Sequence, residues 1–244
     1  MASIETLGPG DFGKGTKKRL PICFCLDVSG SMQGARIVSL NNALKAFFDT
    51  IKENTDATAS VDVAIITYGG IVDVFQGFSP ISKVAAPVVS ERKRSYTPMG
   101  EGILTSLRLL EMRKQAYKDR GLKYYQPWLV LITDGKPEGP NAEEAFENAV
   151  RNLNEMEAAD KVVVFNIGVG EDADMDSLRR VSVKREYPIR ADEKNLSSYF
   201  QFLGSSSTNV VKGGDVSQLY QEIVEKEGIA PDDNEFDISK WVKQ

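Results

Sequence analysis

The apolar run of residues 21–26 ends abruptly in Asp27, and Ser29 and Ser31 follow at alternate positions around Gly30. A short apolar run with such boundaries is typical of a fully buried strand. In an open α/β sheet, ligands bind at the carboxyl ends of the strands. The pattern therefore places three oxygen-bearing side chains where a central strand ends, and these are the first candidate ligands.

The rest of the chain alternates between strand and helix patterns. Apolar residues recur at helical spacing over residues 35–54, and a β-branched strand follows at 61–68. The Gly69–Gly70 pair predicts a hairpin that returns as a third, solvated edge strand over 71–78. The remaining expected elements are a helix starting at residues 97–98, a strand at 127–132, a helix at 141–156, a strand at 162–169, a short helix at 174–181, a short strand at 187–190 and a helix at 196–203. This order predicts a mostly parallel six-stranded α/β sheet with one antiparallel edge strand and helices on both faces.

Both ends of the chain differ from this regular middle part. Residues 1–17 are rich in glycine and nearly match a phosphate-binding loop, but Gly15 stands where Ser or Thr is needed and no strand precedes it. We expect a flexible N-terminal arm there. We expect residues 205–244 to form a partly helical C-terminal extension, with a helix at 216–227, that packs on the domain or on a partner.

Composition excludes several classes of function. The net charge of −5 disfavours nucleic acid and anionic membranes as partners, because both require a basic face. The 244 residues include no histidine, which excludes His-dependent nucleophiles, a His general base and zinc sites built on His. A bound metal would therefore sit on oxygen ligands, and Mg²⁺, Mn²⁺ and Ca²⁺ are the ions that suit them.

Cys23 and Cys25 are the only cysteines, and they face the same side of the first strand. A disulfide between them is geometrically poor, so we expect two small core residues in a reduced, cytoplasmic protein. No apolar run reaches the ~18–20 residues of a membrane span, and no signal-peptide core is present at the N-terminus.

Two further segments supply oxygen ligands. Asp134 ends the strand at 127–132, and Thr97 stands at a helix start. Because the carboxyl ends of parallel strands share one edge of a sheet, we expect a metal site made of Asp27, Ser29, Ser31, Thr97 and Asp134. The alternative is that these residues only cap loops and helices.

Three segments carry a resemblance to a known family: Cys25–Met32, Tyr96–Glu101 and Leu131–Gly135. Together they resemble the three parts of a von Willebrand factor type A (VWA) domain, over about residues 18–204. The resemblance implies a Rossmann-like, doubly wound fold with a metal-ion-dependent adhesion site. It implies direct hydroxyl ligands at Ser29 and Ser31, the second-loop threonine at Thr97, and carboxylates at Asp27 and Asp134 that bind directly or through water.

Arg19–Pro21, Asn41–Leu44 and Phe200–Ser207 are similar to the intracellular bacterial TerY-like (tellurium-resistance) group of this family. That resemblance implies a role in a bacterial stress-response or signalling system, alongside a kinase and a phosphatase as partners.

The expected function is a non-enzymatic, metal-dependent protein-interaction module. Such a site leaves one coordination position of a Mg²⁺-type ion for a Glu or Asp of a partner protein. One alternative is a Mg²⁺-dependent phosphohydrolase that uses Asp27 and Asp134, for which Lys136 is the only nearby positive side chain. Another is a scaffold with a vestigial site.

Three other stretches contain candidate chemistry. Asp172–Asp176 begins like a Ca²⁺ loop but lacks its Gly and terminal Glu, so we interpret it as a helix start. Glu91–Arg94 is interpreted as a solvated loop, with a recognition rim as the alternative. Four aromatic residues cluster just before or at the start of the strand at 127–132. We expect them to pack in the core and anchor a loop rather than to form a hot spot for a partner. They are Tyr117, Tyr124, Tyr125 and Trp128.

Overall fold

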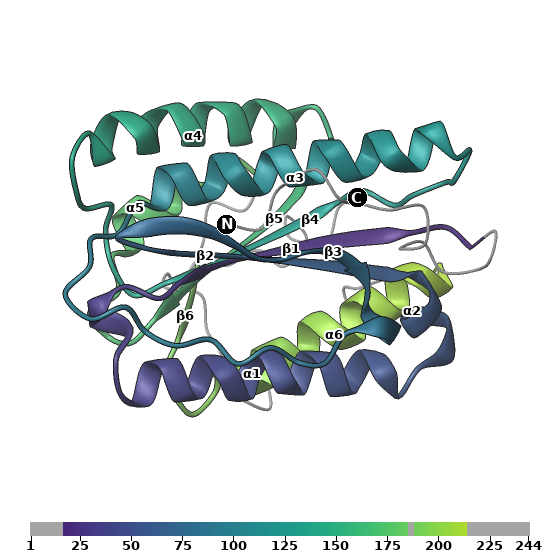
Figure 1. Cartoon of the computed structure of the whole chain (residues 1–244), viewed down its shortest axis with the longest axis horizontal. Coiled ribbons are helices and arrows are strands. Elements are labelled where there is room, and N and C mark those ends of the chain that lie inside the picture. Colours follow the sequence, from purple (N-terminus) through teal and green to yellow (C-terminus); the bar gives the residue numbers. More distant parts are fainter. Residues whose placement is uncertain (1–16, 185–187, 214–244) are drawn as a thin grey trace.

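The computed structural model describes residues 17–184 and 188–213 as a six-stranded sheet between two layers of helices (Figure 1). The strand order is β3-β2-β1-β4-β5-β6, and only the β2–β3 pair is antiparallel. The main elements, in chain order, are β1 (Leu20–Asp27), α1 (Ala35–Lys52), α2 (Thr55–Ser60), β2 (Val61–Gly69), β3 (Ile71–Pro80), α3 (Met99–Asp119), β4 (Trp128–Thr133), α4 (Ala142–Ala158), β5 (Val163–Val169), α5 (Met175–Arg180), β6 (Ile189–Ala191) and α6 (Leu196–Lys212). The predicted fold class is confirmed, including β3 as the antiparallel edge strand.

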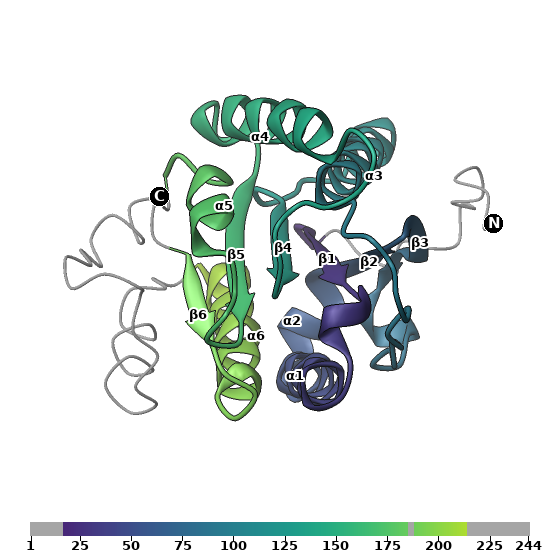
Figure 2. The same cartoon turned by 90° about the vertical axis from the view of Figure 1, so that its left-hand side faces the viewer.

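Strand β1 lies in the middle of the sheet, with every residue buried. It pairs in parallel with β2 on one side and β4 on the other. Leu26 lies opposite Ile132, one residue before Thr133 ends β4, so the residues that follow β1 and β4 emerge side by side. This register brings the two predicted ligand segments to the same edge of the sheet. Figure 2 views the molecule from this carboxyl edge.

Successive β1 side chains face opposite helix layers, as the period of two requires. Phe24 packs between α1 and α6, with ring centroids 5.0 Å from Phe47 and 5.7 Å from Phe200. Cys23 and Cys25 face the α3 and α4 side, where both are fully buried and free. Figure 2 shows α1, α2 and α6 on one face of the sheet and α3, α4 and α5 on the other.

The amino edge of the sheet is held by a buried polar cluster. Asp62 at the start of β2 accepts hydrogen bonds from Arg19, from Arg113 and from the Tyr117 hydroxyl. Arg113 and Asp62 are both fully buried, so each charge depends on the others for its compensation. This cluster ties the start of β1 and the end of α3 to the sheet, at the edge opposite to the predicted site.

The structure corrects several predicted boundaries. Helix α3 begins at Met99 with Pro98 at the N-cap, so Thr97 lies outside the helix and does not cap it. The sequence reading missed α2, which Asn54 caps through its side chain. Helix α6 extends nine residues beyond the predicted end at Leu203.

Some predictions fall outside the described residues. They are the N-terminal arm except Lys17, residue 187 of the short strand, and the part of the C-terminal extension from residue 214 on, which includes the helix at 216–227. In residues 17–184 and 188–213, no helix has both the length and the apolar character needed to cross a membrane.

Candidate metal centre

The loop after β1 folds tightly around the first carboxylate. Asp27 is fully buried and its Oδ1 accepts a hydrogen bond from the backbone N–H of Ser29 at 2.8 Å. The chain then enters a 3₁₀ turn, Gly30–Met32, which places the Ser31 side chain at the surface. A Cβ atom at Gly30 would lie 3.0 Å from the backbone nitrogen of Arg94, so glycine lets the loop containing Arg94 pack closely here.

The end of β4 meets this loop through two hydrogen bonds between side chains, and a third lies within the loop. Thr133 Oγ1 donates to Asp27 Oδ2 at 2.6 Å, and Ser31 Oγ donates to Asp134 Oδ1 at 2.8 Å. The hydroxyl oxygens of Ser29 and Ser31 lie 3.1 Å apart. Four of the five predicted ligands therefore form one continuous polar cluster, although Asp134 is more than 100 residues from the serines in sequence.

Thr97, the fifth predicted ligand, lies beside the turn that follows Asp134. Its backbone pairs reciprocally with that of Glu138, with N···O distances of 3.2 and 3.0 Å. Thr97 is 4 % exposed, and a Cβ atom at Gly135 would lie 4.0 Å from its Oγ1. The hydroxyl thus faces the Asp134 turn from the α3 side. No hydrogen bond between Thr97 Oγ1 and another described residue brings it into the cluster.

Asp27 is a buried acid, and hydrogen bonds from its neighbours offset only part of the free-energy cost of burying its charge. Burial raises the pKa of Asp27 to about 6, while the hydrogen bonds from Ser29 and Thr133 act in the opposite direction. The nearby charge of Asp134 adds a further, smaller increase. Positive charge beside this pair of carboxylates therefore stabilises their ionised forms.

Sequence reasoning missed two residues of the cluster, Thr133 and Arg36. Arg36 lies in the first turn of α1, and its Nη1 donates to Asp134 Oδ2 at 2.5 Å. Its Nη2 donates to Asp172 Oδ1. A cation in the first turn of a helix opposes the helix dipole, and this unfavourable placement is the signal that the sequence contained.

The donor set fits a hard divalent cation. It combines three hydroxyls with two carboxylates, and such oxygen ligands suit Mg²⁺, Mn²⁺ and Ca²⁺. Within the described ranges 17–184 and 188–213, no group of three or more Cys, Asp or Glu side chains could hold a metal, so the candidate centre depends on its hydroxyls as well as on its two carboxylates.

Two of the three other candidate stretches, Asp172–Asp176 and the aromatic residues, have structural roles in the described part of the chain. Asp174 caps α5 by accepting from the backbone and the hydroxyl of Ser177. The rings of Tyr117 and Tyr124 lie 5.6 Å apart, and the Tyr125 hydroxyl donates to a backbone carbonyl of α6. The Trp128 ring lies 4.8 Å from that of Phe165 in the core.

Comparisons with known proteins agree with this architecture. The chain is 25 % identical to inter-alpha-trypsin inhibitor heavy chain H3 of Rattus norvegicus over 166 residues, which is 67 % of this chain. It spans only 18 % of the length of that relative.

Two solved structures share the fold at low sequence identity. The vWF domain of the type V pili tip protein Mfa5 from Porphyromonas gingivalis is 12 % identical, with a TM-score of 0.57, and the match covers 81 % of this chain and 97 % of that one. The pilus adhesin SpaC from Lactobacillus rhamnosus GG, in its open conformation, is also 12 % identical, with a TM-score of 0.59, over 84 % of this chain and 31 % of that one. The family model for the von Willebrand factor type A domain matches residues 22–202, and the chain belongs to this family.

Proposed function

We propose that this VWA domain is a metal-dependent protein-interaction module. In this proposal a Mg²⁺-type ion (Mg²⁺, Mn²⁺ or Ca²⁺) is held by the five predicted ligands, Asp27, Ser29, Ser31, Thr97 and Asp134. When bound, the ion supplies an electrophilic position that a Glu or Asp of a partner protein can fill. The observation that carries the proposal is the hydrogen-bonded cluster from Asp27 through Ser31 to Asp134, which assembles two distant segments at one edge of the sheet.

The charge of the donor set favours an anionic partner group. Three of the five ligands are neutral hydroxyls, and one of the two carboxylates, Asp134, is paired with Arg36. A divalent ion in this cluster would keep net positive charge, which a carboxylate from outside would compensate.

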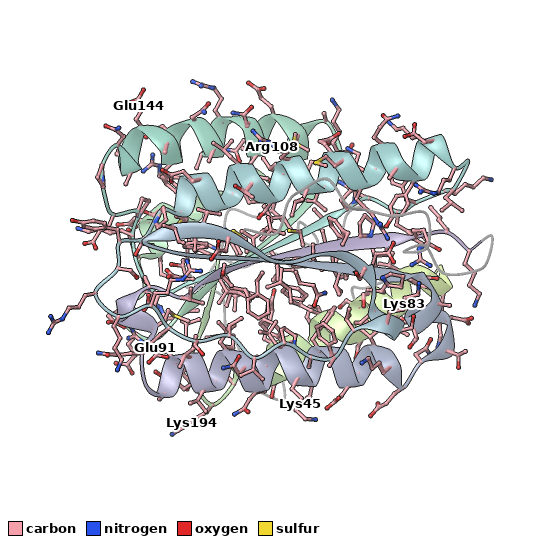
Figure 3. All side chains as sticks on the ribbon, viewed as in Figure 1. Lys45, Lys83, Glu91, Arg108, Glu144 and Lys194 are labelled. Carbon is pink, nitrogen blue, oxygen red and sulfur yellow. The ribbon has the colours of Figure 1, made fainter. Side chains whose placement is uncertain are left out.

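Two of the loops beside the cluster add positive charge at the surface, whereas the loops after β5 and β6 carry the acids Asp172 and Glu193. Lys93, Arg94 and Lys136 are exposed, and no ion pair joins any of them to another residue in the described part of the chain. Arg94 packs against Gly30, and Lys136 follows Asp134 by two residues. Glu91, labelled at the same edge in Figure 3, is only half-exposed. Such a rim favours the approach of an acidic partner surface.

We extend the proposal to the setting of the protein. The similarity of three segments to the TerY-like group supports a cytoplasmic bacterial stress-response or signalling system with kinase and phosphatase partners. The buried, free thiols of Cys23 and Cys25 are compatible with a reducing compartment.

The phosphohydrolase alternative fits the cluster less well. Both carboxylate oxygens of Asp27 accept hydrogen bonds, and the side chain is fully buried, so it is not presented as a nucleophile. Lys136 is exposed and contacts neither acid. We therefore expect no Mg²⁺-dependent turnover of generic phosphoesters such as p-nitrophenyl phosphate; turnover that Asp27→Asn abolishes would favour the enzyme instead.

The proposal is tested by affinity capture from an extract of the source cells, with Mg²⁺ or with EDTA. A partner retained with Mg²⁺ and released by EDTA is expected for the wild type and for Ser79→Ala, which alters a half-buried serine of β3 away from the cluster. Capture should be lost with Ser29→Ala. Equal capture by wild type and Ser29→Ala, or capture unaffected by EDTA, would contradict the proposal.

A further inference from the structure

Arg36 joins the candidate metal centre to two acids outside it. Its guanidinium donates to Asp134 Oδ2 at 2.5 Å and to Asp172 Oδ1, and its Nε lies 3.8 Å from Glu193 Oε1. These acids follow β4, β5 and β6, respectively. The guanidinium of Arg36 on α1 therefore contacts acids from three different loops at the carboxyl edge of the sheet.

The backbone around this cation leaves room for it. Gly170 directly follows β5 and has a φ of 95°, and a Cβ atom there would lie 2.8 Å from Arg36 Nη2 and 3.1 Å from its Cζ. The same atom would lie 3.0 Å from Asp172 Oδ1. A side chain at Gly170 would thus displace the Arg36–Asp172 pair, so the site of the guanidinium depends on this glycine.

The guanidinium and a metal ion would compete for the charge of one carboxylate. The Asp134 side chain is fully buried; its Oδ1 accepts from Ser31 and its Oδ2 from Arg36. Two cations near one buried carboxylate repel each other more strongly than they would in bulk water. Asp172 and Glu193 offset this repulsion in part, because they draw the guanidinium outward.

We propose that Arg36 is a built-in counter-cation that lowers the affinity of the centre for its divalent ion. Retention of the ion then depends more strongly on the carboxylate of the partner, so metal and partner bind cooperatively. The inference rests on the metal-binding function proposed above.

The test uses Mn²⁺ alone as the probe, titrated calorimetrically into the metal-free protein at about 0.15 M salt. Arg36→Gln should bind Mn²⁺ about tenfold more tightly than the wild type, which corresponds to about 1.4 kcal/mol. Arg36→Lys keeps the charge and should stay near the wild-type affinity.

Lys45→Gln is the matched control, since it removes one positive charge from the same helix and breaks only the exposed pair with Asp49. Lys45 lies nine residues along α1 from Arg36, about 13 Å along the axis, which is beyond the screening length of about 8 Å. Figure 3 shows Lys45 on the outer side of α1. Its Mn²⁺ affinity should be that of the wild type.

A second pair of variants keeps the test valid if Arg36→Gln does not fold. Asp172→Asn removes one of the two outer acids, so the guanidinium pairs more strongly with Asp134, and Mn²⁺ binding should weaken about threefold. The matched control is Glu171→Gln, which changes the neighbouring acid and should leave Mn²⁺ binding unchanged.

Unchanged or weaker Mn²⁺ binding by Arg36→Gln would overturn the role of Arg36, and so would equal binding by Asp172→Asn and Glu171→Gln. In both cases, binding by the wild type would still support the metal site. Absence of Mn²⁺ binding in the wild type and in every variant would overturn both proposals.

Discussion

The Thr133 hydroxyl donates a 2.6 Å hydrogen bond to Oδ2 of Asp27, across the parallel pairing of β1 and β4. Asp134, the next residue, accepts from Ser31 in the loop that Asp27 begins. Thr133, the last residue of β4, and Asp134, which follows it, thus contact the two ends of the Asp27–Ser31 loop. The geometry of the centre therefore follows from the pairing of β1 with β4.

The raised pKa of Asp27 predicts a stability change in the metal-free protein. Burial raises this pKa from its ordinary value of 3.8 to about 6, so the folded state binds the proton more tightly than the unfolded state. Stability contributed in this way is present below pH 4 and is lost as the pH rises through about 6. At pH 7.5 in EDTA, Asp27→Asn should raise the free energy of unfolding by about 1–3 kcal/mol; at pH 4 the gain should vanish. Urea denaturation at both pH values measures it, and a variant less stable than wild type at pH 7.5 would contradict this account.

The buried cluster at the amino edge predicts a loss of stability that leaves the metal centre intact. Asp62→Asn removes the buried negative charge that pairs with the guanidinium groups of Arg19 and Arg113, which should cost about 3–5 kcal/mol. Asp73→Asn breaks a half-exposed pair with Arg92 and should cost less than about 1 kcal/mol. Urea denaturation compares the two variants. Mn²⁺ affinity should be unchanged in both variants. Equal losses of stability would show that the buried cluster contributes no more to stability than the half-exposed pair does.

The close approach of α3 and α4 predicts that a single methyl group disturbs both stability and the Thr97 loop. A Cβ atom at Gly100 would lie 2.4 Å from the backbone carbon of Ala145 and 2.5 Å from the nitrogen of Phe146. Gly100→Ala should therefore cost about 1–3 kcal/mol and, because α3 begins two residues after Thr97, should weaken Mn²⁺ binding.

Gly77→Ala is the control for that change, because nothing lies within 4 Å of the added atom. Thermal denaturation and Mn²⁺ titration of both variants make the comparison. A Gly100→Ala protein that matches Gly77→Ala in stability and in Mn²⁺ affinity would show that the helix contact does not position Thr97.

The sequence was sufficient to predict the sheet and the convergence of Asp27 with Asp134. Both follow from a general rule, because buried parallel strands place their carboxyl ends on one edge. Arg36 could not be predicted in the same way, since its partners lie on loops about 100 to 160 residues away and no periodic pattern links them. Thr133 could not be singled out either, because threonine is common in β-strands and its presence at a strand end does not indicate a role in a site.

The misjudged end of α6 has a different physical cause. Gly204 and the serines after it weaken the apolar pattern, but a Cβ atom at Gly204 would lie 2.9 Å from Thr50 Cβ on α1. Ser206 and Ser207 are fully buried in the same helix. Small residues here allow two helices to approach closely, and a hydrophobicity pattern does not reveal such packing.

The central claim, that the centre binds a divalent cation, is tested most directly by thermal unfolding of the purified protein with EDTA and with excess Mg²⁺ or Mn²⁺. An ion that binds only the folded state stabilises it by about 2.7 kcal/mol at a hundredfold excess over its dissociation constant. The account predicts a higher melting temperature with metal for the wild type and no rise for Asp27→Ala. Identical melting temperatures of the wild type in EDTA and in excess metal would contradict it.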